Sequence, residues 1–325
     1  MKDVQVLLDN RDGRVWDVGS ICPEFSWKTS RSAKPSSVDL TLMKDALFQQ
    51  REFEVGSGDI VRITVDGKGL FYGYVFELEQ GKGATVKIKA YDQIRYLNEQ
   101  DFYMRTNVTA DQVIRDNALS AGLRLGELTP TYHVIPKVLE EGQKRIDIIC
   151  KALDSTLLAK NRLYVLYDDF GSLRLSEVSD MRTDLVLGDG SLIYDFRMKR
   201  SIDNATFNRI KLAQEDSASG MLRTYVDGDP DTIGQWGRLQ YYKKVDGGMN
   251  QEQIREMIGT LLLLRNREER TFSIEALGYP GVRAGVLLQV SLTGEDVNGL
   301  FLVEECTHRF AGGAHTMKLE MKVYG

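Results

Sequence analysis

A pattern of strand-like blocks in the first third of the chain returns, in the same order, at the C-terminal end. In each copy an alternating apolar run predicts a strand, a glycine begins the next strand, and a further alternating run ends in tyrosine. The first copy spans 33 positions (58 to 91) and the second spans 39 (285 to 324), a difference that loop insertions account for. Three blocks in one order indicate an internal duplication of a β domain. The aligned blocks are Gly58–Val65 with Gly285–Leu292, Gly69–Phe71 with Gly299–Phe301, and Val86–Tyr91 with Leu319–Tyr324.

The length and composition fit two such domains with additions. At roughly 150 residues per domain, the 325 residues predict about two domains. Glycine occurs 30 times and proline 6 times, which favours strands joined by tight turns. Small all-β domains commonly protect their edges by closing into barrels. We therefore expect an α+β, mainly β fold that contains two related β-barrels.

Helical periodicity interrupts the β pattern. Thr109–Gln112 is a capping box that begins a helix, which Gly122 ends. A second helix places Cys150 on an apolar stripe, where it acts as a small hydrophobe, and a third helix begins at Asn250. The expected parts are a first β-barrel at 1–100, an inserted α/β lobe at 101–184, a second β-barrel at 185–229 with 270–325, and a helical insert at 230–269.

Composition and motifs exclude several classes of protein. The net charge of -5 does not supply the phosphate neutralisation of a nucleic-acid-binding surface, and three scattered cysteines encode no disulfide framework. The N-terminus lacks the apolar run of a signal peptide, and the most apolar stretch elsewhere, Thr260–Leu264, is far too short for a membrane span. Nucleotide-binding glycine loops, serine elbows and His-Glu-x-x-His motifs are missing from the sequence. We expect no catalytic residue, no cofactor and no membrane span.

One group of side chains near the C-terminus could carry chemistry, and it consists of Cys306, His308 and His315. If Gly312-Gly313 forms a two-residue hairpin turn, paired residue numbers sum to 625 and the three side chains lie on one face. They could bind zinc, with Glu304 as a further ligand, or form a Cys/His nucleophile pair. We interpret them instead as part of a buried seam and expect no metal, because that face also carries Phe310, Met317, Leu319 and Met321.

Neighbouring carboxylates occur at Asp168-Asp169, Glu268-Glu269 and Glu304-Glu305. A glycosidase needs two acids that face each other across a cleft. Adjacent residues of a strand point to opposite faces, so these pairs lack that geometry. We expect them to be solvated surface acids, and we see no partner for His133 in its presumed loop.

Several short motifs resemble one known family in order and spacing. Phe272–Gly285 and Thr307–Met317 resemble the XkdQ-type tail proteins of phages and phage-like particles. The same resemblance extends over nearly the whole chain through Ala90-Tyr91-Asp92 with Ile94 and Tyr96-Leu97, Lys151-Ala152-Leu153, and Tyr242–Asp246.

The resemblance implies a baseplate hub of a contractile tail or tailocin, similar in plan to the hub part of VgrG spikes. Such hubs are homotrimers whose subunits each contribute two similar tube barrels, so that three chains match a hexameric tail tube to a trimeric central spike. The implied partners are further copies of the chain, the tail tube protein, the central spike protein, the tape-measure protein and baseplate wedge proteins, without sequence-specific nucleic acid. The hub would assemble in the bacterial cytoplasm and end in an extracellular tail, and its negative charge suits the lining of an ejection channel.

Two other functions remain open. A tail-associated peptidoglycan hydrolase would need a water-accessible acid pair or the cluster around His308. A monomeric β-barrel binding module would have no self-assembly.

Overall fold

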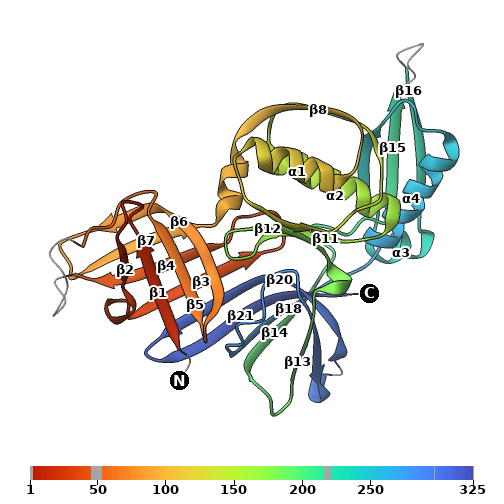
Figure 1. The fold of residues 1–325 in the computed structure, drawn as a ribbon. Coiled ribbons are helices and arrows are strands. Elements are labelled where there is room, and N and C mark those ends of the chain that lie inside the picture. Colours follow the sequence, from red (N-terminus) through yellow and green to blue (C-terminus); the bar gives the residue numbers. More distant parts are fainter. Residues whose placement is uncertain (1–2, 45–52, 216–220, 296, 325) are drawn as a thin grey trace. The chain divides into compact units, whose positions relative to one another are not determined.

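The chain folds into two units. The computed structural model describes residues 3–44, 53–215, 221–295 and 297–324. The larger unit comprises Met1–Leu157, Arg162–Arg197 and Phe272–Gly325, and the smaller comprises Leu158–Asn161 and Met198–Thr271. The larger unit holds both β repeats and a helical lobe (Figure 1).

The first repeat is a curved sheet with the strand order β3-β4-β7-β6-β5-β1-β2 (Figure 1). Its strands bury every second side chain, as in β5, where Val61, Ile63 and Val65 enter the core and the residues between them do not. The sequence alternation therefore has its expected structural meaning. The strands are β1 (Val4–Asp9), β2 (Val15–Asp17), β3 (Glu24–Ser30), β4 (Ser37–Met43), β5 (Ile60–Val65), β6 (Lys68–Gln80) and β7 (Thr85–Tyr91).

The second repeat has the order β14-β18-β21-β20-β19-β13, which matches β3-β4-β7-β6-β5-β1 position by position. One relation differs, because β1 pairs antiparallel with β5 whereas β13 pairs parallel with β19. The common order confirms that the two sheets are related. The strands are β13 (Arg182–Gly188), β14 (Ile193–Ser201), β18 (Glu269–Leu277), β19 (Leu287–Leu292), β20 (Val297–Ala311) and β21 (Ala314–Val323).

The same backbone hydrogen bonds recur where β6 and β20 pass the start of the preceding strand. In the first repeat, Gly58 N donates to Val75 O at 2.8 Å and Val75 N donates to Asp59 O at 2.9 Å. In the second, Gly285 N donates to Val303 O at 2.8 Å and Val303 N donates to the oxygen of the next residue, Val286, at 3.0 Å. Val75 and Val303 are therefore equivalent residues.

A β-bulge follows each of these valines. The ladder between β6 and β7 shifts between Val75 and Glu77, and the ladder between β20 and β21 shifts between Val303 and Glu305. Bulges change the direction of a strand and are specific features of a fold. Their presence at equivalent positions supports duplication more strongly than strand order does.

The structural equivalence corrects part of the sequence alignment. The first block, which aligns Ile63 with Val290, is correct. Phe71 lies opposite Ile63 and Gly299 lies opposite Val290, so Phe71 is equivalent to Gly299 and not to Phe301. The second and third blocks are thus shifted by two residues. A shift of two keeps every side chain on its face, so alternation alone does not detect it.

The lobe between the repeats packs two helices against strands. Gln112 Oε1 accepts from Thr109 N at 3.0 Å, and Gly122 has a φ of 69°, which confirms the predicted start and end of the first helix. Cys150 is partly buried against the lobe core, as its apolar stripe predicted. The elements are β8 (Gln100–Val108), α1 (Ala110–Ser120), β9 (Leu125–Leu128), β10 (Ile135–Lys144), α2 (Arg145–Lys160), β11 (Tyr164–Asp168) and β12 (Leu173–Glu177).

The smaller unit is a three-stranded sheet with helices. Its central strand β15 pairs with both β16 and β17. The sequence placed the strands near 207–226 in the second barrel, and this was wrong because they complete the sheet of the insert. Strand propensity does not say which sheet a strand joins. The elements are β15 (Arg209–Glu215), β16 (Leu222–Gly228), α3 (Pro230–Trp236), β17 (Gln240–Val245) and α4 (Gln251–Arg265).

Among the described residues, no helix is long and apolar enough to cross a membrane.

Candidate functional site at the seam between the repeats

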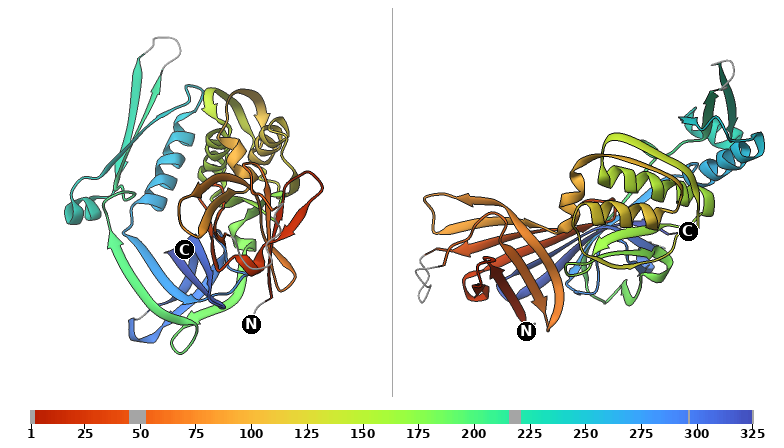
Figure 2. Two further views of the ribbon diagram at one scale, coloured as in Figure 1. Left: turned by 90° about the vertical axis from the view of Figure 1, so that its left-hand side faces the viewer. Right: turned by 45° about the horizontal axis from the view of Figure 1, so that its top comes forward.

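A backbone ladder between β20 and β3 joins the two repeats edge to edge. It is antiparallel and runs from Glu305 opposite Ser30 to Ala311 opposite Glu24. The blue strands of the second repeat consequently lie beside the red strands of the first in Figures 1 and 2. The ladder pairs an edge of the first sheet that would otherwise be open to association. We call this contact the seam.

Aromatic rings from both repeats pack on the apolar side of the seam. Phe25 of β3 stacks on Phe310 of β20 with ring centroids 4.5 Å apart, and Trp27 stacks on His308 at 5.2 Å. His315 of β21 stacks on the Phe310 ring at 3.9 Å. Phe25, Trp27 and Phe310 are at most 7% exposed. Burial of these rings stabilises the contact between the repeats.

His308 uses both ring nitrogens inside the seam. Its Nε2 lies 2.7 Å from the carbonyl oxygen of Val282, and because a carbonyl only accepts, Nε2 carries a proton and donates. Its Nδ1 lies 2.9 Å from Nε2 of His315, so this nitrogen is also hydrogen-bonded. A metal ion would need a ring lone pair that is not already engaged. His308 therefore has the geometry of a structural core residue.

The predicted hairpin brings Cys306, His308 and His315 together. Residues pair with numbers that sum to 625, from Ala311 opposite Ala314 to Glu305 opposite Glu320, which confirms the predicted register. Cys306 Sγ lies 3.2 Å from His308 Nε2, and burial raises the pKa of the thiol, so the reactive thiolate is disfavoured. Within the described ranges, no group of three His, Cys, Asp or Glu side chains could hold a metal ion.

Glu304, considered as a further zinc ligand, has a different partner. It occupies the bulge of β20, and its carboxylate accepts from Arg31 through Nε at 3.0 Å and Nη2 at 2.9 Å. A two-bond contact of this kind is well oriented because the guanidinium and carboxylate are both planar. Glu304 therefore ties β20 to the turn after β3.

Further ion pairs follow the polar side of the seam. Glu305 Oε2 lies 2.7 Å from Lys28 Nζ, and its other oxygen lies 3.7 Å from Lys34 Nζ. At the far end of the ladder, Arg309 donates to Glu24 at 2.8 Å. Ion pairs of both polarities thus cross the seam, with the basic side chain on β3 or its turn at Glu305 and on β20 at Glu24.

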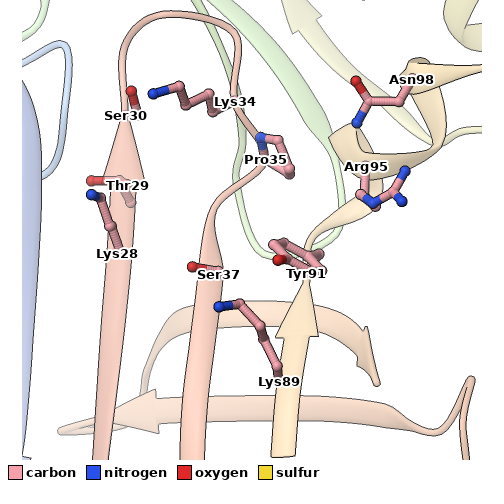
Figure 3. Close-up of a pocket in the computed structure, with 10 residues that line it drawn as sticks. All are labelled: Lys28, Thr29, Ser30, Lys34, Pro35, Ser37, Lys89, Tyr91, Arg95 and Asn98. Carbon is pink, nitrogen blue, oxygen red and sulfur yellow. The ribbon is translucent and has the colours of Figure 1, made fainter. Parts of the chain in front are cut away.

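A basic pocket of about 350 Å³ opens beside the seam (Figure 3). Three of its four cationic side chains have carboxylate partners, because Glu305 serves Lys28 and Lys34 while Asp39 lies 3.4 Å from Lys89. The lining itself carries four cationic side chains and no acidic one, while Glu305, Asp39 and Glu77 lie next to these cations. The lining residues are Lys28, Thr29, Ser30, Lys34, Pro35, Ser37, Lys89, Tyr91, Arg95 and Asn98.

A buried charged cluster connects both repeats with the lobe. Arg283, in the loop before β19, donates to the backbone oxygen of Asp168 at 3.0 Å, and its guanidinium lies over the Tyr167 ring at 4.3 Å. Burial and the nearby Asp168 together raise the pKa of Asp92 to about 7, against hydrogen bonds from Ser36 that lower it. Burial likewise raises the pKa of Asp168 to about 6. Sequence reasoning missed this cluster, although Asp92 and Arg283 both lie in motifs that carry the family resemblance.

The other polar residues singled out from the sequence are dispersed. Asp168 is only 6% exposed, so its prediction as a surface acid was wrong: it accepts from Gln93 and from Gly171 N at 2.6 and 2.7 Å. Asp169 lies 3.2 Å from Arg174, and His133 Nε2 lies 3.2 Å from Ser155 Oγ. Glu268 lies 3.7 Å from Arg270, and Glu304 and Glu305 have basic partners across the seam.

Comparison with known proteins places the chain in a family. The model of the YQBQ-like family matches residues 25–322. The chain belongs to the YQBQ-like family. It is also 28% identical, over 306 residues, to the phage-like element PBSX protein XkdQ of Bacillus subtilis, covering 93% of this chain and 92% of that protein. The resemblance read from the motifs is therefore confirmed.

Solved structures share the fold. The 43 kDa tail protein of prophage MuSo2 from Shewanella oneidensis superposes with a TM-score of 0.73 at 13% identity, covering 98% of both chains. The E. coli c3393 protein, a type VI secretion component described as similar to the T4 tail proteins gp27 and gp5, has a TM-score of 0.57 at 9% identity, covering all of this chain and 77% of the other. The fold is thus that of phage-tail and baseplate-type proteins.

Proposed function

We propose that this YQBQ-like chain is the structural hub of a contractile-tail baseplate, in a phage, tailocin or phage-like particle. In this role it is a homotrimer that joins the hexameric tail tube to the trimeric central spike and lines the ejection channel. The observation that carries the proposal is the paired repeat, in which two sheets of equal strand order and equal bulges are joined edge to edge within one chain.

The symmetry argument is physical. A sixfold ring and a threefold spike do not present matching surfaces, so a protein between them needs contacts of both kinds. One chain with two near-equivalent domains lets three copies present six similar surfaces to the tube and three identical surfaces to the spike. The buried Cys306 and His308 support a structural role, since hydrolysis needs groups that water and substrate can reach.

The proposed parts follow the division expected from the sequence, adjusted for the insert. The two tube domains, at 1–100 and at 185–197 with 272–325, would face the tube and line the channel for the tape-measure protein. The lobe at 101–184 and the insert at 198–271 would face neighbouring subunits and wedge proteins. In this role the chain is assembled in the cytoplasm and released as part of an extracellular particle.

The test is incorporation into a particle. The full chain, tagged and co-expressed with the tube and spike proteins of the same particle, is expected to co-purify with both at three copies per spike trimer. A chain that binds neither protein, or that degrades peptidoglycan in a zymogram, would contradict the proposal.

A further inference from the structure

The seam joins two strand edges, one from each repeat. Each of these edges has a counterpart in the other repeat, and the described part of the chain leaves both counterparts unpaired. One side is the end of β20 after its bulge, Glu305–Ala311, which extends beyond the last β19 pair at Leu302. The other side is β3, the end strand of the first sheet next to β4. By the common strand order, their equivalents are the end of β6 after its bulge, Glu77–Gln80, and the end strand β14.

The equivalent of the β20 side is open. The β5 ladder with β6 reaches Tyr74, and the bonds at Val75 end it. From Glu77 to Gln80, β6 pairs with β7 on one side only, in the part of the chain that the structure describes. The other edge of Glu77–Gln80 is therefore unpaired among the described strands. It corresponds to the edge of β20 that pairs with β3 at the seam.

The equivalent of β3 is open as well. Within the described ranges, β14 pairs only with β18. Tyr194 and Phe196 of β14 are 57% and 37% exposed, whereas Phe25 and Trp27 of β3 are 5% and 4% exposed. Aromatic side chains on an unpaired edge strand favour association with another strand.

The charges of the two open edges are complementary, as are those of Lys28 and Glu305 at the seam. The open end of β6 carries Glu77, opposite Lys89 of β7, and Glu79, which lies 3.6 Å from Lys87 of β7. Glu77 is the equivalent of Glu305, which pairs with Lys28. The open strand β14 carries Arg197, Lys199 and Arg200 against one acid, Asp195. Opposite charges on facing strands favour pairing, and like charges oppose it. Two β14 strands would repel each other, which disfavours a symmetric β14 dimer.

We propose that β14 of one copy pairs antiparallel with the end of β6, Glu77–Gln80, in the next copy, and thereby repeats the seam between subunits. The proposal rests on the proposed hub function and names the surface through which copies of this chain join. Each copy would contribute β14 to one neighbour and the end of β6 to the other. Such a head-to-tail interface closes into a ring when the rotation between copies permits it. With the seam inside each chain, three such contacts would place six barrels in one continuous ring.

Cysteine cross-linking tests the contact in the assembled particle. We would combine Arg197→Cys with Glu79→Cys in one chain and treat particles with a short bis-maleimide, followed by a denaturing gel. The expected products are covalent dimers and trimers in high yield. Each single variant, and a control that combines Arg197→Cys with Asp12→Cys at the β1–β2 turn, is expected to stay monomeric or to give only traces of dimer.

The outcomes separate this inference from the function. The same experiment is repeated with Arg197→Cys and Glu77→Cys. Particles that contain a trimer of the chain but give no covalent trimer with either cysteine pair would overturn the inference and leave the hub function standing. Failure of the chain to enter particles at all would overturn the hub function. A second readout is Glu77→Gln with Glu79→Gln, which removes both charges without placing like charges opposite Lys89 and Lys87. It is expected to lower incorporation at least tenfold with little change in the melting temperature of the isolated chain. Unchanged incorporation would also count against the contact.

Discussion

Glu77 and Glu305 occupy the same position in the two repeats, directly after equivalent bulges, but they differ in what faces them. Glu305 has Lys28 at 2.7 Å and Lys34 at 3.7 Å across the seam, because β3 of the first repeat is paired there. Glu77 lies opposite Lys89 of β7, and no described strand pairs with it on its other side. One chain thus contains both an occupied and an open copy of the same surface, which provides matched controls for several experiments.

Changes of charge at the two glutamates should have unequal effects in the isolated chain. Glu305→Lys replaces two attractive pairs with repulsion at partly exposed positions, and it is expected to lower the free energy of unfolding by about 1 kcal/mol. Glu77→Gln, which removes one exposed charge opposite Lys89, is expected to change it by less than about 0.5 kcal/mol. Urea unfolding at low and high salt measures both values, and the Glu305 effect should shrink at high salt. Equal effects at the two positions would contradict the assignment of the seam.

Truncation of the seam aromatics should be costly. Trp27→Ala removes a buried ring that stacks on His308, and it is expected to destabilise the larger unit by about 3–5 kcal/mol. Tyr194→Ala, on the open strand β14, is the matched control and should cost less than about 1 kcal/mol. Thermal unfolding monitored by near-ultraviolet circular dichroism distinguishes the two. A mild effect at Trp27 would mean that the repeats do not depend on this contact.

The buried carboxylates should make stability fall as the pH rises. Burial raises the pKa of Asp92 to about 7, far above the ordinary value of about 3.9. Between these values the folded chain keeps a proton that the unfolded chain has lost, so the contribution is complete below about pH 4 and is lost as the pH rises through about 7. Carbon-13 NMR of the aspartate carboxyls, assigned with Asp92→Asn, should show one group that titrates near 7. A titration of Asp92 near 4 would refute this environment.

The cysteine thiols should react slowly. Burial raises the pKa of Cys22 and of Cys150 to about 11, and it also raises that of Cys306, which is fully buried. At pH 8 a thiol with a pKa near 11 is about 0.1% thiolate, so alkylation of the native chain should be roughly a hundredfold slower than that of a free cysteine. Mass spectrometry of timed iodoacetamide reactions measures this. Rapid modification of Cys306 in the folded chain would reopen the nucleophile interpretation.

Local sequence signals predicted local structure well. The Gly312-Gly313 turn fixed the register of its hairpin because a two-residue turn leaves one pairing, and the capping box at Thr109–Gln112 located α1. The duplication was visible because both repeats keep the same blocks in order. The shift of two residues in the later blocks was not visible, since it preserves the alternation that the alignment rests on.

The seam and the basic pocket needed the tertiary structure. Lys28 lies in β3 whereas Lys89 and Arg95 lie in and just after β7, and the pairing of β3, β4 and β7 brings them to one pocket. The ladder between β20 and β3 joins residues about 280 positions apart, and edge pairing of this kind leaves no periodic signal. The assignment of β15 and β16 failed for the same reason, because alternation identifies a strand and not its neighbours.

The most direct measurement is a cryo-electron-microscopy reconstruction of the assembled tail at the junction of tube and spike. The account predicts a ring of three chains in which six barrel-type domains alternate between first and second repeats at equal angular spacing. A ring built from six copies of the chain, or a ring in which the two repeats lie at different radii, would contradict it.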